Sequence, residues 1–142
     1  MVSGIMEING IAHIFLTVSN FERSRCFYSE LLPFIGLQAV IDNPGVYYCV
    51  GARTAIGIQE SGDKATDDRF QQSRVGLHHF CLRARNRDDI DTFFKKAVEI
   101  GATIVRKPTE GQWAPGYYST LIEDPDGIRL EINYVPGKGL LE

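Results

Sequence analysis

The sequence contains few cysteines. Cys26, Cys49 and Cys81 are the only three among 142 residues, and no pair has CxxC or CxxxC spacing. An odd, sparse set argues against a disulfide framework and favours a reducing compartment, so we expect a cytoplasmic protein. The chain also lacks any run near 18 apolar residues, and residues 1–8 lack the basic region of a signal peptide. We therefore expect no membrane association and no secretion.

Long runs of like charge are also missing. Fifteen basic and 18 acidic residues give a formal net charge of −3, and no run of one sign reaches five residues. Because acids and bases are interspersed, we expect no nucleic-acid partner. Hydrophobic residues make up 44% of the chain, which is enough to bury one compact core. The length and composition predict a single domain over residues 1–142.

Two stretches of the chain are alike. Residues 11–20 and 77–86 are both apolar and alternating, have a histidine at their third position, and end in an asparagine that can cap a helix. The two histidines, His13 and His79, are 66 positions apart. This repetition predicts two structural modules of similar length.

The elements expected after each stretch are also alike. Ser19 and Glu22 have the spacing of a capping box at the start of the first helix. The apolar stripes of the two helices are Phe27, Tyr28, Leu31 and Leu32, and then Ile90, Phe93, Phe94, Ala97 and Val98. Further strands are expected at 37–41, 46–50, 55–59, 102–105, 117–122 and 128–134, so each module is β-α-β-β-β. We place module one at 8–60, a polar linker at 61–75, module two at 76–135 and a tail at 136–142.

Polar side chains gather on the face that points away from the predicted helices. Because successive strand residues point to opposite faces, His13 and His79 share this face with Glu131 and Gln59, whereas His78 is expected on the helix side. Two imidazoles and a carboxylate on rigid strands suit a divalent metal. A lone histidine or glutamate in a strand is more often structural, but His13 and His79 occupy equivalent positions of the repeat, which favours a metal site.

Three segments resemble the vicinal oxygen chelate superfamily, which includes glyoxalase I, methylmalonyl-CoA epimerase, extradiol dioxygenases, fosfomycin-resistance transferases and bleomycin-resistance proteins. They are Gly-Ile-Ala-His at 10–13, Gly-Leu-His-His-Phe at 76–80 and Glu-Asp-Pro-Asp-Gly-Ile-Arg-Leu-Glu-Ile at 123–132. The resemblance extends from about residue 8 to residue 134. It implies an α+β fold in which two βαβββ modules form a mixed, mainly antiparallel, cup-shaped eight-stranded sheet with the helices outside.

The resemblance also implies a metal and its ligands. His13, His79 and Glu131 match the family's two histidines and its carboxylate, and the ion would be zinc, nickel, manganese, cobalt or iron. Glyoxalase I supplies a second glutamate at the fourth position and the epimerase a glutamine. Here Gln59 is the candidate, with Gly57 as the alternative and Glu60 only if the strand register slips by one residue. If Gly57 holds the position, two histidines and one carboxylate remain, as in non-haem iron sites.

The function that the resemblance implies is a metal-dependent lyase or isomerase of glyoxalase type. It would act on a small carbonyl or thiol-conjugate substrate through a metal-stabilised enediolate, with Glu131 as the catalytic base. The alternatives are a non-haem iron ring-cleaving dioxygenase, a transferase, and a metal-free resistance protein that binds a drug or metabolite. A homodimer is compatible with each of these functions.

Substrate contacts are expected along the same face. Phe15 and Cys81 follow the two histidines by two residues, and alternation also places Arg83 on this face. Trp113 and Tyr117 lie in the segment that joins the second and third strands of module two, where they can line the mouth of the site. Packing of these aromatics on the sheet is an equally good explanation of that segment.

Overall fold

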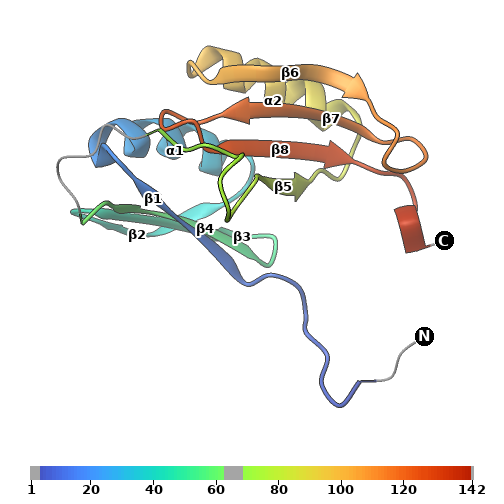
Figure 1. The fold of residues 1–142 in the computed structure, drawn as a ribbon, viewed down its shortest axis with the longest axis horizontal. Helices are drawn as coiled ribbons and strands as arrows, with labels where there is room; N and C mark the ends of the chain where they lie inside the picture. Colours follow the sequence, from blue (N-terminus) through green and yellow to red (C-terminus); the bar gives the residue numbers. More distant parts are fainter. Residues whose placement is uncertain (1–3, 63–68, 142) are drawn as a thin grey trace.

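The computed structural model describes residues 4–62 and 69–141 (Figure 1). It confirms the α+β class and the β-α-β-β-β order of both modules. Residues 63–68 of the predicted linker lie outside the described residues. The first module contains β1 (His13–Val18), α1 (Phe21–Phe34), β2 (Gln38–Asn43), β3 (Val46–Gly51) and β4 (Thr54–Glu60). The second contains β5 (Phe80–Arg83), α2 (Asp88–Glu99), β6 (Thr103–Glu110), β7 (Tyr118–Glu123) and β8 (Arg129–Tyr134), and a 3₁₀ helix, η1 (Gly139–Leu141), follows in the tail.

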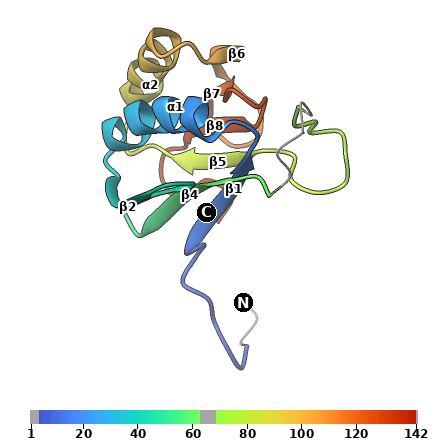
Figure 2. The same cartoon turned by 90° about the vertical axis from the view of Figure 1, so that its left-hand side faces the viewer.

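The eight strands are divided equally between two sheets within one chain. Their orders are β1-β4-β3-β2 and β5-β8-β7-β6. In each sheet one pair is parallel, β1 with β4 or β5 with β8, and the other two pairs are antiparallel, so the mixed, mainly antiparallel character is as predicted. The expectation of one continuous sheet is thereby refined, because β1 and β5 are each an edge strand of their own sheet. Residues 4–12 extend away from the body at the free end of β1 (Figures 1 and 2).

The helices begin differently from the prediction. Asn20 caps α1, and its side chain accepts a hydrogen bond from the Arg23 amide at 3.0 Å, so the expected Ser19–Glu22 capping box does not form. The reason is that Ser19 is engaged by module two, as described below. Helix α2 has no side-chain cap hydrogen bond, and three acidic residues in its first turn complement the helix dipole instead.

One hydrophobic core joins both modules. On β1, Leu16 and Val18 are buried whereas Phe15 and Thr17 are exposed, which is the alternation that the sequence predicts. Of the nine predicted helix-stripe residues seven are buried, Phe94 is half-buried, and Val98 is 52% exposed, so its place in the stripe is wrong. The core's fully buried side chains include Tyr28, Leu31, Leu32, Ile56, Ile58, Ile90, Phe93, Ile122 and Leu130. Among the helices in residues 4–62 and 69–141, none is long and apolar enough to cross a membrane.

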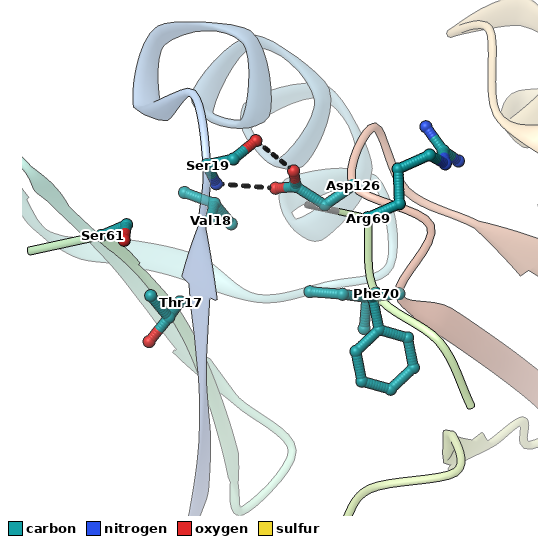
Figure 3. Close-up of a pocket in the computed structure, with 8 residues that line it drawn as sticks. Thr17, Val18, Ser19, Ser61, Arg69, Phe70 and Asp126 are labelled. Atoms are coloured by element: carbon teal, nitrogen blue, oxygen red, sulfur yellow. Dashed lines mark hydrogen bonds between the residues drawn. The ribbon is translucent and has the colours of Figure 1, made fainter. Parts of the chain in front are cut away.

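The Asp-Pro-Asp-Gly turn between β7 and β8 connects the two modules. Buried Asp124 accepts a hydrogen bond from the Tyr28 hydroxyl of α1 at 2.6 Å, and also from the amides of Asp126 and Ile128 at 2.8 and 2.9 Å. Asp126 accepts from both the amide and the hydroxyl of Ser19, at the end of β1 (Figure 3). This turn lines a pocket of about 220 Å³ between the modules. The motif that carries the family resemblance therefore has a structural role here.

We expect Asp124→Ala to lower the free energy of unfolding by about 3 kcal/mol. The substitution leaves the buried Tyr28 hydroxyl and two backbone amides without their acceptor, and each unsatisfied buried group costs about 1–3 kcal/mol. Urea denaturation measures the loss. Asp42→Ala is the matched control, because Asp42 pairs with Arg25 on the exposed surface and such pairs contribute about 0–1 kcal/mol. Equal losses in the two variants would contradict a special role for the turn.

Candidate metal centre

One half of the candidate site lies on module two. His79 immediately precedes β5, and Glu131 lies on the neighbouring strand β8, where its backbone is paired with Cys81. The His79 Nε2 and Glu131 Oε1 atoms are 3.3 Å apart. Glu131 is buried, with 8% of its surface exposed, so its carboxylate is held within the sheet face rather than in free solvent. The parallel pairing of β5 with β8 brings these two predicted ligands together.

The second carboxylate oxygen of Glu131 has its own partners. The Tyr117 hydroxyl donates a hydrogen bond to Oε2, and an Arg106 guanidinium nitrogen lies 3.8 Å from the same oxygen. Burial, together with the bond to Glu131, raises the pKa of Tyr117 to about 12, so its hydroxyl keeps its proton at neutral pH. Oε2 is thus held by protein donors, which leaves Oε1 directed toward His79.

A β-bulge brings Arg106 to this face. Ile104 pairs with Ile122, whereas Arg106 pairs with Leu121, and the register shifts between them. Ile122 is buried in the core, but Leu121 pairs with Glu131 on the opposite face of β7. Strict alternation would have placed Arg106 on the same face as Ile104, so the bulge redirects its side chain toward Glu131.

Cys81 and Arg83 lie on β5 beside Glu131. Burial of the thiol, and then the negative charge of Glu131 and a hydrogen bond to it, raise the pKa of Cys81 to about 12. The positive charges of Arg83 and Arg106 lower the pKa of this thiol, so both guanidinium groups lie near Cys81. The residue as a whole is exposed, yet its thiol is protonated at neutral pH and unsuited to nucleophilic attack.

His78 is the immediate neighbour of His79 and contacts it. The two Nδ1 atoms are 2.8 Å apart, and the ring planes meet at 76°. The expectation that His78 faces the helix is wrong, because both histidines precede β5 and the strict alternation of a strand does not apply there. His78 is instead exposed.

The other half of the site lies on module one. His13 is the first residue of β1, and its ring contacts the edges of Phe15 and Tyr48 at centroid distances of 5.7 and 6.4 Å. Phe15 and Tyr48 are themselves stacked 5.3 Å apart. The three rings form a continuous aromatic surface on the face of this sheet that points away from α1.

The strand registers relate the two halves position by position. Gly57 pairs with Phe15, as Glu131 pairs with Cys81, and Phe15 and Cys81 are equivalent positions of the repeat. Gly57 therefore corresponds to Glu131, and Gln59, which is exposed, corresponds to Asn133 two residues farther along. A Cβ atom on Gly57 would lie 2.6 Å from Phe15 and 2.8 Å from Tyr48, so these rings fill the space that a side chain would need.

The candidate ligands are divided between the two sheets. Among the described residues, no group of three histidine, cysteine, aspartate or glutamate side chains is placed to hold a metal ion. His79 and Glu131 are together, whereas His13 lies on the other sheet. Trp113 is 77% exposed in the loop between β6 and β7, and Tyr117, from the same loop, reaches Glu131.

Three residues beside the candidate ligands, Tyr48, Arg106 and His78, were not among the predicted site residues. Tyr48 could have been found by extending the alternation to β3. Arg106 was hidden by the bulge and His78 by the irregular backbone before β5. No pattern in the sequence marks either feature.

Comparisons with known proteins agree on one family. The family model described as Glyoxalase/Bleomycin resistance protein/Dioxygenase superfamily matches residues 10–132. The metallothiol transferase FosB of Shouchella clausii (strain KSM-K16) is 27% identical over 132 residues, which are 89% of this chain and 80% of that protein. The Bacillus subtilis (strain 168) protein YqjT is 27% identical over 123 residues, which are 84% of this chain and 94% of that protein. A crystal structure of a candidate glyoxalase from Bacillus halodurans has a TM-score of 0.77 and 25% identity to this chain. The match covers 89% of this chain and 96% of that one.

Proposed function

This chain belongs to the Glyoxalase/Bleomycin resistance protein/Dioxygenase superfamily, and we propose that it is a metal-dependent lyase or isomerase of glyoxalase type. Its substrate would be a small carbonyl compound or a thiol conjugate. The observation that carries the proposal is the pairing of His79 Nε2 with Glu131 Oε1 at 3.3 Å, on a face lined by Cys81 and Tyr117. The resemblance of the fold to a candidate glyoxalase at 25% identity supports the reaction class.

The spacing of these two atoms fits two ligands of one ion. Imidazole nitrogen and carboxylate oxygen bind zinc at about 2.0–2.2 Å, so two such ligands at a tetrahedral angle are about 3.4 Å apart. His79 Nε2 and Glu131 Oε1 have this separation without any rearrangement. The ion would be zinc, nickel, manganese, cobalt or iron, all of which accept imidazole and carboxylate ligands.

The third ligand, His13, would come from a second copy of the chain. Within one chain His13 lies on the sheet that does not carry His79 and Glu131, and the strands β1 and β5 are both free at one edge. Apolar side chains are exposed at or near these two edges, namely Ile11 at 70%, Phe15 at 46% and Leu77 at 43%. Unpaired edges with exposed apolar side chains favour association. We propose a homodimer in which β1 of one copy lies beside β5 of the other.

Each residue of the proposed site has a distinct part in the reaction. A bound divalent ion would supply Lewis-acid polarisation of the substrate oxygens. Glu131 is proposed as the base: its Oε1 would leave the ion when substrate binds, take the proton from the carbon beside the carbonyl and return it to the neighbouring carbon, while Tyr117 keeps Oε2 in place. Phe15, Cys81, Arg83 and Trp113 are proposed to contact the substrate. Gln59 is unable to act as a base, since an amide is not basic.

Turnover of an aldehyde–thiol hemithioacetal tests the proposal. The metal-free protein is loaded in turn with zinc, nickel, manganese, cobalt and iron, and isomerisation of the hemithioacetal is followed by absorbance. We expect turnover with at least one metal and none in the metal-free protein. A folded, metal-loaded protein that leaves the hemithioacetal unchanged would contradict the glyoxalase-type reaction.

An iron-dependent ring-cleaving dioxygenase is the second candidate. It is favoured by the correspondence of Gly57 with Glu131, because this leaves two histidines, one carboxylate and open positions on the metal. Oxygen uptake by the iron-loaded protein with a catechol, in the absence of hemithioacetal turnover, would support it. The same measurement without oxygen uptake would exclude it.

Thiol transfer is a further candidate, favoured by the similarity to the Shouchella clausii metallothiol transferase. The high pKa of Cys81 argues that the thiol would belong to the substrate and not to the chain. Consumption of a small thiol together with an electrophile, dependent on added metal, would identify this activity. A protein that binds its ligand without converting it would show none of the three reactions.

Gln59→Ala tests the fourth ligand position. Since Gln59 corresponds to Asn133 and not to Glu131, we expect the variant to bind the metal within about threefold of the wild-type affinity, well short of the roughly 10- to 100-fold changes seen for partners of metal ligands. Isothermal titration with zinc measures the affinity, and Gln38→Ala, an exposed glutamine on β2 of the same module, is the matched control. A loss of more than about 100-fold in Gln59→Ala alone would instead make Gln59 the fourth ligand.

A further inference from the structure

The contact between His78 and His79 bears on how the metal is bound. The Nδ1 atoms of the two rings are 2.8 Å apart, which is hydrogen-bonding distance. Only one of these two nitrogens can carry a hydrogen in that contact. The ring that donates has its proton on Nδ1, and the ring that accepts has a free lone pair on Nδ1.

A metal ligand must present a free lone pair. The His79 nitrogen that faces Glu131 is Nε2, so in the metal-bound protein His79 Nε2 carries no hydrogen. A neutral imidazole has one N–H group, which must then be on Nδ1. That N–H group needs an acceptor, and the nitrogen within reach of it is Nδ1 of His78.

We propose that His78 is the positioning residue of the metal centre, accepting a hydrogen bond from His79 Nδ1–H and thereby fixing the tautomer and ring orientation of His79. The inference rests on the proposed function, because it assigns His79 as a ligand. His78 suits this part because it is exposed, so its own Nε2–H reaches water and no buried polar group is left unsatisfied. Outer partners of this kind orient metal-bound histidines and account for about 10- to 100-fold in metal affinity.

The same contact also serves the metal-free protein. There His79 Nε2 can carry the hydrogen and face Glu131 Oε1 at 3.3 Å, while His79 Nδ1 accepts from His78. The two arrangements differ only in which nitrogen of each ring carries the hydrogen. His78 therefore holds the His79 ring in one orientation before and after the metal binds.

Two substitutions of His78 test its proposed role as the acceptor of the hydrogen bond from His79. His78→Ala removes the acceptor, and we expect zinc affinity to fall about 10- to 100-fold. His78→Asn retains an acceptor, Oδ1, at the same number of bonds from Cβ as Nδ1, and we expect its affinity to stay within about threefold of wild type, because the hydrogen bond that fixes the ligand is kept. Titration calorimetry on the metal-free protein measures both, and far-UV circular dichroism checks that the variants are folded.

Nitrogen-15 NMR of the imidazole rings adds a readout that a purely structural role would not change. In the zinc-bound wild type and His78→Asn we expect His79 to carry its hydrogen on Nδ1, with slow exchange with water. In His78→Ala we expect that hydrogen to exchange rapidly. Equal zinc affinity in wild type and His78→Ala, or equal losses in the alanine and asparagine variants, would overturn the inference.

The failure of the proposed function has a different signature. A wild-type protein that takes up no zinc would refute the metal-dependent function and, with it, the part assigned to His78. Uptake by the wild type with unchanged affinity in His78→Ala would refute only the inference about His78. The zinc titration of the wild type, carried out first, separates the two results.

Discussion

His79→Ala is expected to abolish metal-dependent turnover and to weaken zinc binding by more than about 100-fold. The substitution removes the nitrogen that lies 3.3 Å from Glu131 Oε1, and losses of about 10- to 100-fold already follow when only the partner of a ligand is removed. Glu131→Gln is expected to have the same effect on turnover, because the amide is neither a charged ligand nor a base. Zinc affinity by calorimetry and hemithioacetal turnover measure the two effects.

Glu110→Gln is the matched control for Glu131→Gln. Glu110 is an exposed carboxylate on β6 that pairs with Arg87 at 3.3 Å, so the substitution removes the same charge from the same module. We expect its zinc affinity and turnover to equal those of the wild type. Folded His79→Ala and Glu131→Gln proteins that keep wild-type zinc affinity would show that the metal is bound elsewhere or not at all.

Mixing two inactive variants is expected to restore metal binding. If His13 of one copy shares a site with His79 and Glu131 of the other, a dimer of His13→Ala with His79→Ala contains one intact site and one that lacks both histidines. One of the two sites in every mixed dimer is intact, so the purified mixed dimer should regain about half of the wild-type sites. Each variant alone should have close to none.

The experiment is done by co-expressing the two chains with different tags and measuring zinc content and turnover of the doubly purified dimer. His79→Ala mixed with Glu131→Gln is the control, since both substitutions lie in the same half of the site and no mixed dimer regains it. A mixture of His13→Ala and His79→Ala that stays as inactive as its parents would mean that the site does not combine residues from two copies.

The alternation of strand residues was enough to predict much of the candidate site. Burial of Leu16 and Val18 places His13 on the opposite face of β1, and burial of Leu130 and Ile132 does the same for Glu131. These assignments need only a period of two and a helix on one side of the sheet. For this reason the βαβββ order and the faces of the strands could be predicted without a structure.

Register and irregular backbone were beyond such prediction. The bulge that turns Arg106 toward Glu131 and the irregular segment that joins His78 to His79 leave no mark on the pattern of apolar residues. The choice between Gly57 and Gln59 likewise depends on which residue of β4 lies beside Phe15, and this pairing is set by the packing of the Phe15 and Tyr48 rings. The division of the strands into two sheets depends on contacts between the modules, such as those of Asp124 and Asp126.

The metal content of the purified chain tests the central claim most directly. Protein prepared without chelator, or metal-free protein titrated with zinc, should bind about one divalent ion per chain, as expected for one site of two histidines and one carboxylate per chain. The same measurement on His79→Ala should give close to none. A folded wild-type protein that binds no divalent ion, or a His79→Ala variant that binds as much as the wild type, would contradict the proposed metal centre.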